Sequence, residues 1–219
     1  MQVINKKTMK SINLETKVYF SDISKTADEA EFNRIYETMP AWRKEKINSY
    51  RFKKDKDLSL IAGVLLKEAC IDFGIEGTDE NIVLGENGKP AFRDSNIKFS
   101  ISHSGDKVMC AMSEKNIGCD VEKKEKIKEK IADRFFADKE NEYIHLSDDK
   151  DDAFFRIWTL KESFMKCTGL GMKLPLNEFE IEISGDEIKV NQNICDKTFI
   201  FKEYDFDDGY KYSLCIEEN

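Results

Sequence analysis

The sequence has few residues that break regular structure and no segment typical of a membrane protein. Its 219 residues include only 3 prolines and 11 glycines, which excludes low-complexity and fibrous classes. No apolar run approaches the roughly 20 residues of a membrane helix, and the first twenty residues lack the apolar stretch of a signal peptide. With 40% hydrophobic residues, we expect a globular protein with no membrane partner.

Patterns typical of metal-binding or redox cysteines are also missing. None of the six cysteines forms a C-x-x-C pair, so neither a zinc site nor a thioredoxin-like motif is indicated. A chain with this cysteine usage fits a reducing compartment, and we expect a cytoplasmic protein.

The balance of charge excludes a general nucleic-acid binder. The net charge is −8 and the pI is about 5.1, whereas phosphate contacts need positive charge. The segment from Pro40 to Lys56 is the exception, with a local net charge of +5. Its basic residues are Arg43, Lys44, Lys46, Arg51, Lys53, Lys54 and Lys56. A solvated helix face is the default interpretation, although interleaved aromatic residues could support nucleotide stacking.

Hydrophobic periodicity predicts an α+β protein made of two similar lobes. Apolar residues three and four apart predict main helices over 55–73 and from about 151 to 167, and shorter helices over 27–39 and 123–136. Alternation predicts strands at 14–23, 97–101, 108–112, 117–122, 179–183, 188–190, 198–201 and 210–216. Each half then has strands around one main helix. The expected domains are residues 1–115 and 116–219.

Asp120-Val121-Glu122 is the first candidate site. Side chains alternate along a strand, so both carboxylates point to one face, while Cys119 and Val121 point to the other. Two carboxylates so placed can share a hard cation such as Mg²⁺. The alternative is the solvent-facing edge of an amphipathic strand.

The second candidate lies on the predicted helix near residue 160. Four-residue spacing places Trp158, Glu162 and Lys166 on one face. A carboxylate in such a stripe is costly unless it is paired or binds a metal. Glu162 therefore either ligates a cation or forms an ion pair with Lys166 inside the helix.

Two turns complete the candidates. Ser102-His103-Ser104-Gly105 ends a strand, and its histidine can donate to a phosphate oxygen or be an ordinary polar turn residue. Gly88-Lys89-Pro90 could place a lysine near a phosphate, although such a segment is usually only a turn.

Together, these motifs resemble in order and spacing the 4′-phosphopantetheinyl transferases of the Sfp type. The matching segments are Ser100 to Ser104, Gly118 to Glu122, Arg134-Phe135-Phe136 followed by Glu140, and Trp158 to Gly171 with the pattern W-x-x-K-E-x-x-x-K-x-x-G-x-G. That family moves the phosphopantetheine arm of coenzyme A to a serine of an apo acyl or peptidyl carrier protein and releases adenosine 3′,5′-bisphosphate. The resemblance implies two lobes related by a pseudo-twofold axis, with the site in the cleft between them, and a protein that works as a monomer.

The resemblance also implies roles for individual residues. Mg²⁺ would be held by Asp120, Glu122 and Glu162. Coenzyme A would be contacted by Arg43, Lys46, Lys89, Pro90, Ser102, His103, Lys161 and Lys166, with Arg43 and Lys46 at the 3′-phosphate. Glu140 matches a carboxylate proposed as general base, and the alternative for Glu140 is a solvated acid in a charged loop.

One position departs from the family pattern, and two other functions remain open. Many relatives have an arginine where this chain has Ser59, so that phosphate contact is either absent or made by Lys53, Lys54 or Lys56. A non-catalytic module that binds coenzyme A or a carrier protein would not need three convergent carboxylates. A Mg²⁺-dependent phosphodiesterase or nuclease would use the same carboxylates without a carrier.

Overall fold

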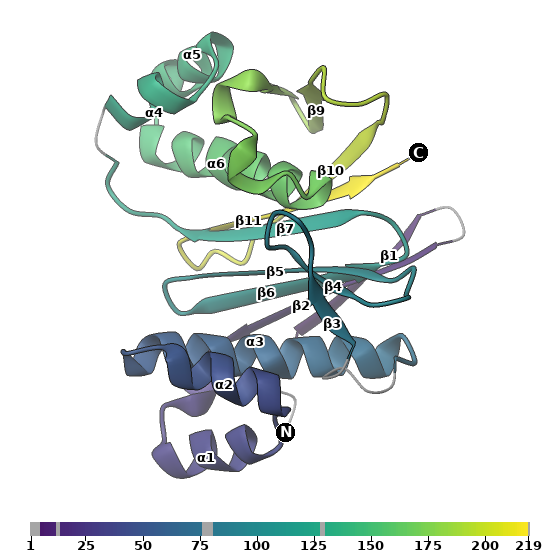
Figure 1. Cartoon of the computed structure of the whole chain (residues 1–219). Helices are drawn as coiled ribbons and strands as arrows, with labels where there is room; N and C mark the ends of the chain where they lie inside the picture. The colour runs from purple at the N-terminus through teal and green to yellow at the C-terminus, as the bar shows by residue number, and fades with distance from the viewer. Residues whose placement is uncertain (1–4, 12–13, 76–80, 128–129, 219) are drawn as a thin grey trace. The chain divides into compact units, whose positions relative to one another are not determined.

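The structure is a computed structural model that describes residues 5–11, 14–75, 81–127 and 130–218 (Figure 1). The described chain divides into two compact units. Unit 1 contains the residues up to 86 together with 90–114, and unit 2 contains residues 87–89 and those from 115 onward. The strand pairs of the described residues are antiparallel, so the mixed α+β class with small antiparallel sheets is confirmed.

Unit 1 is built on a four-stranded sheet with one long helix against it. The strands are β1 (Asn5–Ser11), β2 (Leu14–Asp22), β5 (Lys98–Ser104) and β6 (Lys107–Ser113), in the order β1-β2-β6-β5. The long helix α3 (Lys53–Asp72) packs on β6, β2 and β5, and Figure 1 shows it lying along this sheet. Its residues Ile61 and Leu65 are fully buried, as the apolar spacing predicted.

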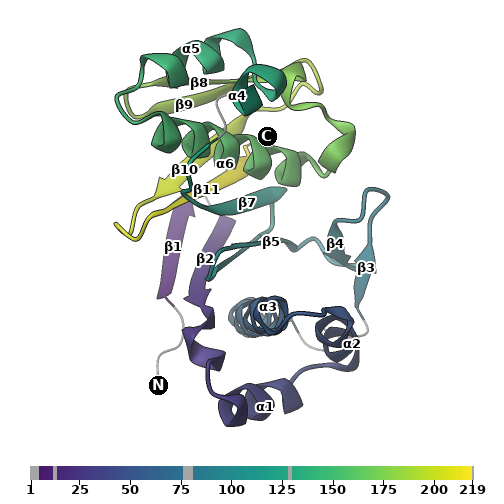
Figure 2. The same ribbon diagram turned by 90° about the vertical axis from the view of Figure 1, so that its left-hand side faces the viewer.

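The remaining elements of unit 1 surround α3. They are η1 (Ile23–Thr26), α1 (Glu29–Glu37), α2 (Ala41–Ser49) and the two-stranded sheet of β3 (Ile82–Leu84) and β4 (Pro90–Phe92). Asp28 caps α1 by accepting a hydrogen bond from the amide of Ala30 at 2.9 Å. Figure 2 shows α3 end-on with α2 beside it. The basic segment is therefore α2 and the start of α3.

Unit 2 has the same components in a smaller sheet. Strands β7 (Ile117–Lys123), β10 (Phe199–Tyr204) and β11 (Tyr210–Glu217) are ordered β10-β11-β7, and α6 (Lys150–Thr168) packs on β7 and β11. Asp149 caps the start of α6 by accepting from the Asp152 amide at 3.0 Å. The helix ends at Gly169, whose φ of 72° lies in the left-handed region that glycine adopts readily.

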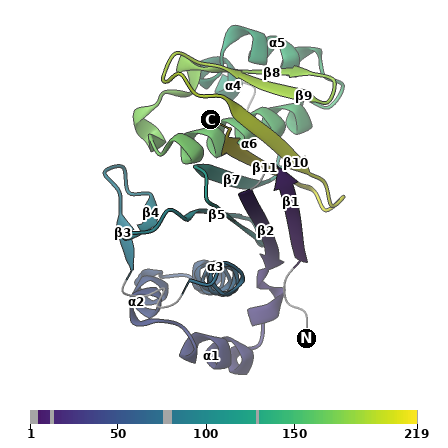
Figure 3. The same cartoon turned by 90° about the vertical axis from the view of Figure 1, so that its right-hand side faces the viewer.

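The other elements of unit 2 are α4 (Lys130–Phe135), α5 (Asp138–Leu146), η2 (Gly171–Lys173), η3 (Leu176–Glu178), and the hairpin of β8 (Glu180–Ser184) and β9 (Glu187–Asn191). Figure 3 shows this hairpin beside α5. The helix predicted over 123–136 is wrong in its first part, because Lys123 still pairs with Tyr210 in the sheet and residues 124–127 have no regular structure. Residues 128–129 lie outside the described residues. The sequence analysis also did not predict α5 or β1.

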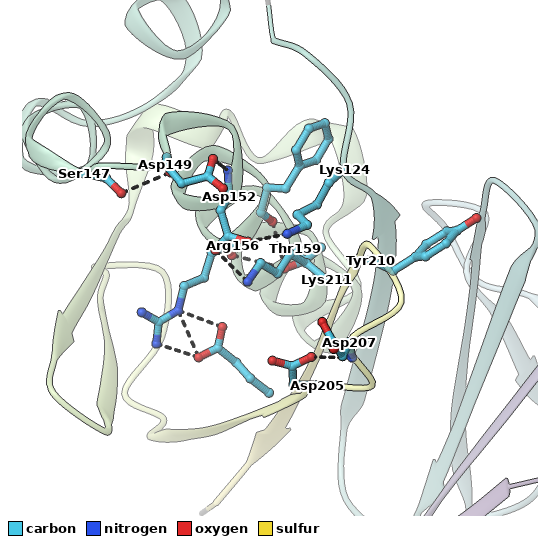
Figure 4. A network of polar contacts seen from close by, with 12 residues as sticks. Lys124, Ser147, Asp149, Asp152, Arg156, Thr159, Asp205, Asp207, Tyr210 and Lys211 are labelled. Carbon is cyan, nitrogen blue, oxygen red and sulfur yellow. Dashed lines mark hydrogen bonds and ion pairs between the residues drawn. The ribbon is translucent and has the colours of Figure 1, made fainter.

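A polar network fixes the first half of α6 to the strands beneath it (Figure 4). Asp152 accepts from Lys124 at 2.8 Å and forms an ion pair with Lys211 at 2.7 Å. One turn later, the guanidinium of Arg156 binds Glu203 through two nitrogens, at 2.9 and 2.7 Å. This bidentate geometry is stronger than a single hydrogen bond. The helix that carries Glu162 and Lys166 is thus anchored at its amino-terminal half.

The helices of the described ranges include none with the length and apolar character needed to cross a membrane.

Candidate active site

The site in unit 2 begins where β7 and α6 touch backbone to backbone at Gly118. A Cβ atom at this position would lie 1.9 Å from the carbonyl oxygen of Ser163 and 2.3 Å from the amide nitrogen of Cys167. Only glycine fits, because real Cβ atoms essentially never come within 3.0 Å of such atoms. The face of β7 that carries Gly118, Asp120 and Glu122 is therefore the face that α6 covers.

Asp120 is buried under α6 and forms an ion pair with Lys166. Only 2% of Asp120 is exposed, and its Oδ1 accepts from the Lys166 ammonium at 2.6 Å. The alternative of a solvent-facing edge is wrong for Asp120. Burial is the largest single effect and opposes the charged form of Lys166, but Asp120 together with Cys119 and Glu162 outweighs it, so the pKa of Lys166 is raised.

Glu162 lies one helical turn before Lys166 and interacts with the charges of Asp120 and Lys166. The Lys166 ammonium forms an ion pair with Asp120 at 2.6 Å, and Glu162 also interacts with the Lys166 charge. The pKa of Glu162 is raised by burial and then by the Asp120 carboxylate, and Lys166 only partly offsets this. The raised pKa of Glu162 therefore reflects burial first and repulsion by the Asp120 carboxylate second. A cation between them would relieve that repulsion.

The carboxylates of Asp120, Glu122 and Glu162 have the ligand chemistry that a hard divalent cation prefers. Asp120 and Glu122 come from one face of β7, and Glu162 comes from the helix that covers this face. Carboxylate oxygens are the ligands that Mg²⁺ uses. Among the described residues, no three or more His, Cys, Asp or Glu side chains lie close enough together to hold a metal ion. The Lys166 ammonium is the positive charge that meets Asp120 here.

Glu140 and Lys161 form an ion pair enclosed in unit 2, and both side chains are 0% exposed. The two oxygens of Glu140 accept from the Lys161 ammonium, from the Ile181 amide at 2.6 Å and from the Ala137 amide at 2.9 Å. Lys161 also donates to the Phe179 carbonyl at 2.7 Å. Burial lowers the pKa of Lys161, with Glu140 opposing.

This geometry corrects one sequence interpretation and bears on another. Glu140 is not a solvated acid in a loop, because it lies in the first turn of α5, where its Oε2 meets the amide of Ala137 at the start of the helix. With no exposed oxygen, Glu140 is also not placed to take a proton from a bound hydroxyl, and Lys161 is not placed to reach a phosphate. Both residues join α5, α6 and β8 in the interior.

Lys89 contacts the main chain at the carboxyl end of α6. Its ammonium donates to the carbonyl of Lys166 at 2.6 Å and to that of Ile117 at 2.9 Å. Two residues earlier, the Asn87 amide donates to the carbonyl of Gly169 at 2.9 Å. Pro90 is half-buried and begins β4. The sequence indicated a turn here but gave no sign of these contacts.

Ser102 and His103 lie near the end of β5 in unit 1. Ser102 is 8% exposed and pairs with Met109 of β6, whereas His103 is exposed and pairs with Val108. Alternation along β5 therefore directs these neighbours to opposite faces. A joint contact of both side chains with one phosphate would most simply require that they share one face. Ser102 and His103 do not share one face.

Arg43 and Lys46 both lie on α2, but they differ in exposure. Arg43 is only 4% exposed, with its guanidinium 4.3 Å from the centre of the Trp42 ring and in the wall of a cavity of about 210 Å³. Burial lowers the pKa of Arg43 to about 10. Lys46 is exposed, and the pKa of Lys46 is lowered by desolvation and then by the Arg43 charge.

The position that departs from the family pattern is buried. Ser59 is 3% exposed, and its hydroxyl has no hydrogen-bond partner in the described part of the chain. Lys53 is bound to Asp57 at 2.9 Å, and Lys54 to Asp106 at 3.0 Å. Lys56 is half-buried. Of the three possible replacements for the missing arginine, Lys56 is the one with no ion pair in the described residues.

Comparison with known proteins identifies the family of this chain. Residues 116–215 match the 4′-phosphopantetheinyl transferase superfamily, and residues 25–115 match its N-terminal region. The chain is 32% identical over 210 residues to the 4′-phosphopantetheinyl transferase ffp of Bacillus subtilis, covering 91% of each. This chain belongs to the 4′-phosphopantetheinyl transferase superfamily. The sequence-based recognition of the family is confirmed.

Other relatives agree over nearly the whole chain. The 4′-phosphopantetheinyl transferase Sfp of Bacillus subtilis strain 168 is 31% identical over 206 residues, with 91% of each chain covered. The 4′-phosphopantetheinyl transferase gsp of Aneurinibacillus migulanus is 33% identical over 202 residues, covering 90% of this chain and 84% of the relative. A member of this superfamily is a transferase of the 4′-phosphopantetheine group, so the prediction of an enzyme is confirmed as well.

Proposed function

We propose that this protein transfers the 4′-phosphopantetheine arm of coenzyme A to a serine hydroxyl of an apo acyl or peptidyl carrier protein. The serine oxygen bonds to the phosphorus that carries pantetheine. The bond from that phosphorus to the bridging oxygen breaks, and adenosine 3′,5′-bisphosphate leaves with the electron pair. Membership of the superfamily supports this reaction, and the Asp120–Lys166 pair is the structural observation that supports its site.

Mg²⁺ is the proposed cofactor, with Asp120, Glu122 and Glu162 as its ligands. When bound, the cation would neutralise charge on the pyrophosphate of coenzyme A. Lys166 supplies a second positive charge beside these carboxylates. Phosphoryl transfer depends mainly on alignment and charge stabilisation, so these four side chains supply what the reaction needs.

Residues of unit 1 are proposed for the nucleotide end of coenzyme A. Arg43 and Lys46 of α2 are the candidates for the 3′-phosphate, with His103 and Ser102 of β5 as further phosphate contacts. The support is chemical: the substrate is a polyanion, and α2 with the start of α3 is the basic segment of an acidic chain. Lys56 is the candidate for the contact that the arginine replaced by Ser59 makes in relatives.

The buried pair of Glu140 and Lys161 has a structural role in this proposal. Because Glu140 has no exposed oxygen, the proton of the serine hydroxyl leaves to water rather than to Glu140. We further propose a cytoplasmic monomer. All six cysteines are free and five are buried, which fits a reducing compartment.

Intact-mass analysis of a panel of apo carriers tests the reaction. Each carrier is incubated with the protein, coenzyme A and Mg²⁺, and the expected result is a gain of one phosphopantetheine group on at least one carrier with release of adenosine 3′,5′-bisphosphate. Binding of coenzyme A without mass gain on any carrier would instead support a binding module. Hydrolysis of coenzyme A or DNA without a carrier would support a phosphodiesterase.

A further inference from the structure

The turn at residues 87–89 supplies hydrogen-bond donors to the carboxyl end of α6. The last carbonyl groups of an α-helix have no partner within the helix. Here Lys89 donates to the carbonyl of Lys166, and Asn87 donates to that of Gly169. A lysine at this end of a helix also matches the negative end of the helix dipole. The turn is therefore a cap that comes from a distant part of the sequence.

The backbone of the turn favours this placement of Lys89. Gly88 has a φ of 78°, in the left-handed region that other residues rarely adopt, so the chain reverses immediately before Lys89. Pro90 restricts the residue before it to extended conformations. Pro90 thus narrows the backbone range of Lys89, and Gly88 turns the chain immediately before it.

One ammonium group also joins the two elements that carry the proposed site. Lys89 binds the carbonyl of Ile117 at 2.9 Å as well as that of Lys166 at 2.6 Å. Ile117 lies three residues before Asp120 on β7, and Lys166 is the partner of Asp120 on α6. The absence of a side chain at Gly118 brings the same two elements together. Lys89 and Gly118 therefore act at the same junction.

We propose that Lys89 is a positioning residue that fixes the last turn of α6 against β7 and thereby sets Lys166 opposite Asp120. Its importance for catalysis rests on the proposed function, in which Lys166 and Asp120 serve the pyrophosphate and its cation. The sequence suggested instead that Lys89 contacts the nucleotide. The two roles differ, because two of the three donors of the Lys89 ammonium are directed at main-chain carbonyls.

Hydrogen exchange of the substrate-free protein tests the positioning role without any assumption about the reaction. Lys89→Met keeps the length of the side chain and removes the ammonium. We expect the amides of residues 166–171 to exchange at least about 10-fold faster, because the last turn of α6 opens more often. Lys89→Arg keeps donors for both carbonyls and restores most of the protection. Lys173→Met removes an exposed lysine from the same unit and serves as the control.

Steady-state kinetics then separate positioning from direct substrate contact. A misplaced Lys166 lowers kcat, and we expect a loss of about 10- to 100-fold with the KM for coenzyme A changed by less than about 3-fold. Lys89→Arg recovers most of kcat. A large rise in KM with normal kcat in Lys89→Met would mean that the ammonium binds coenzyme A itself, which overturns the proposal. Unchanged exchange at residues 166–171 also overturns it.

Two further variants keep these outcomes separate from other causes. Lys166→Met tests the proposed function directly: normal transfer in this variant contradicts the role of Lys166 but leaves the exchange result for Lys89 intact. Asn87→Ala removes only the contact to Gly169, and we expect faster exchange at residues 169–171. If Lys89→Met does not fold, the exchange comparison of Asn87→Ala and Lys89→Arg with the native protein decides whether the turn caps α6.

Discussion

Asp120, Glu122 and Glu162 are single carboxylates whose removal tests the metal site. In separate alanine variants, we expect transfer to fall by more than about 100-fold, because the pyrophosphate charge is no longer fully neutralised. Transfer is measured by intact mass at saturating Mg²⁺, with circular dichroism to verify folding. Glu125→Ala removes an exposed acid just beyond β7 and should leave transfer unchanged. Normal turnover in any one of the three variants removes that residue from the site.

Glu140 is predicted to stabilise the fold rather than to act in the reaction. Glu140→Gln leaves the fully buried Lys161 ammonium without its ionised partner, which we expect to lower the free energy of unfolding by about 3 kcal/mol or more. The kcat of the folded variant should stay within about 3-fold of normal, because no substrate group reaches Glu140.

The control for Glu140 is an exposed neighbour on the same helix. Glu142→Gln should change neither the free energy of unfolding, measured by urea denaturation, nor kcat. General-base action by Glu140 has the opposite signature. It predicts normal stability with a kcat lowered by about 10²–10⁴-fold and unchanged affinity for coenzyme A, and that result would restore the role that the family resemblance implies.

Residue patterns predicted which charged side chains share one face of a strand better than they predicted the partners of those side chains. The alternation at 117–122 placed Asp120 and Glu122 on one face, and β7 confirms that strand. Which face would be covered could not be predicted, because burial of Asp120 depends on α6, which begins some thirty residues later. The same reason explains Lys89 and Glu140, whose partners come from distant elements that local spacing does not identify.

At the scale of elements, the contact of β7 with α6 depends on the missing side chain of Gly118. Gly118→Ala would force the two elements apart, since its Cβ would meet main-chain atoms of α6 that cannot rotate away. We expect a loss of about 3 kcal/mol or more in the free energy of unfolding, at the upper end of overpacking costs, and a loss of transfer as Asp120 moves from Lys166.

Chemical denaturation and transfer assays check the Gly118 variant. Gly185→Asn is the control, because Gly185 lies in the β8–β9 turn with open space around it and asparagine tolerates its positive φ. Wild-type stability in Gly118→Ala would mean that β7 and α6 separate easily.

The predicted elements differ in how well the sequence identified them. The long helices α3 and α6 were predicted nearly to their ends because their apolar spacing is regular over about five turns and their ends carry ordinary stop signals. The sequence analysis missed α5, because the helix has only nine residues and its buried Glu140 binds Lys161 and Ile181, which lie in distant parts of the sequence. The first part of the helix predicted over 123–136 failed because strand pairing with Tyr210 extends β7 to Lys123.

For the whole molecule, Mg²⁺ should stabilise the native state. A ligand that binds only the folded protein adds about 2.7 kcal/mol when its concentration is one hundred times its dissociation constant. We expect the unfolding temperature to rise with Mg²⁺ in the native protein and to stay constant in Asp120→Asn and Glu162→Gln. Differential scanning calorimetry measures this without substrate. An equal rise in the variants would place the cation elsewhere.

The protein is also predicted to act as a monomer of 25.4 kDa. Each sequence motif occurs once, and each unit has its own sheet and long helix, so no second copy is needed to complete a unit. Light scattering at assay concentration should give the monomer mass. Transfer confined to a larger species would contradict this prediction. The pseudo-twofold relation of the two units remains a prediction from the family resemblance.

Residues 87–89 belong to unit 2, so a carboxyl-terminal fragment that begins after them lacks part of that unit. Unit 2 is not contiguous in sequence, because Lys89 and Asn87 meet partners that lie 77 and 82 positions later. A fragment that begins at residue 115 would contain every strand and helix of unit 2 and still lack the donors that bind Lys166 and Gly169. During synthesis, the turn leaves the ribosome well before α6, and contacts over such separations form slowly. Expression of the carboxyl-terminal half alone should therefore yield a sheet and helices whose α6 frays at the end nearest Lys166.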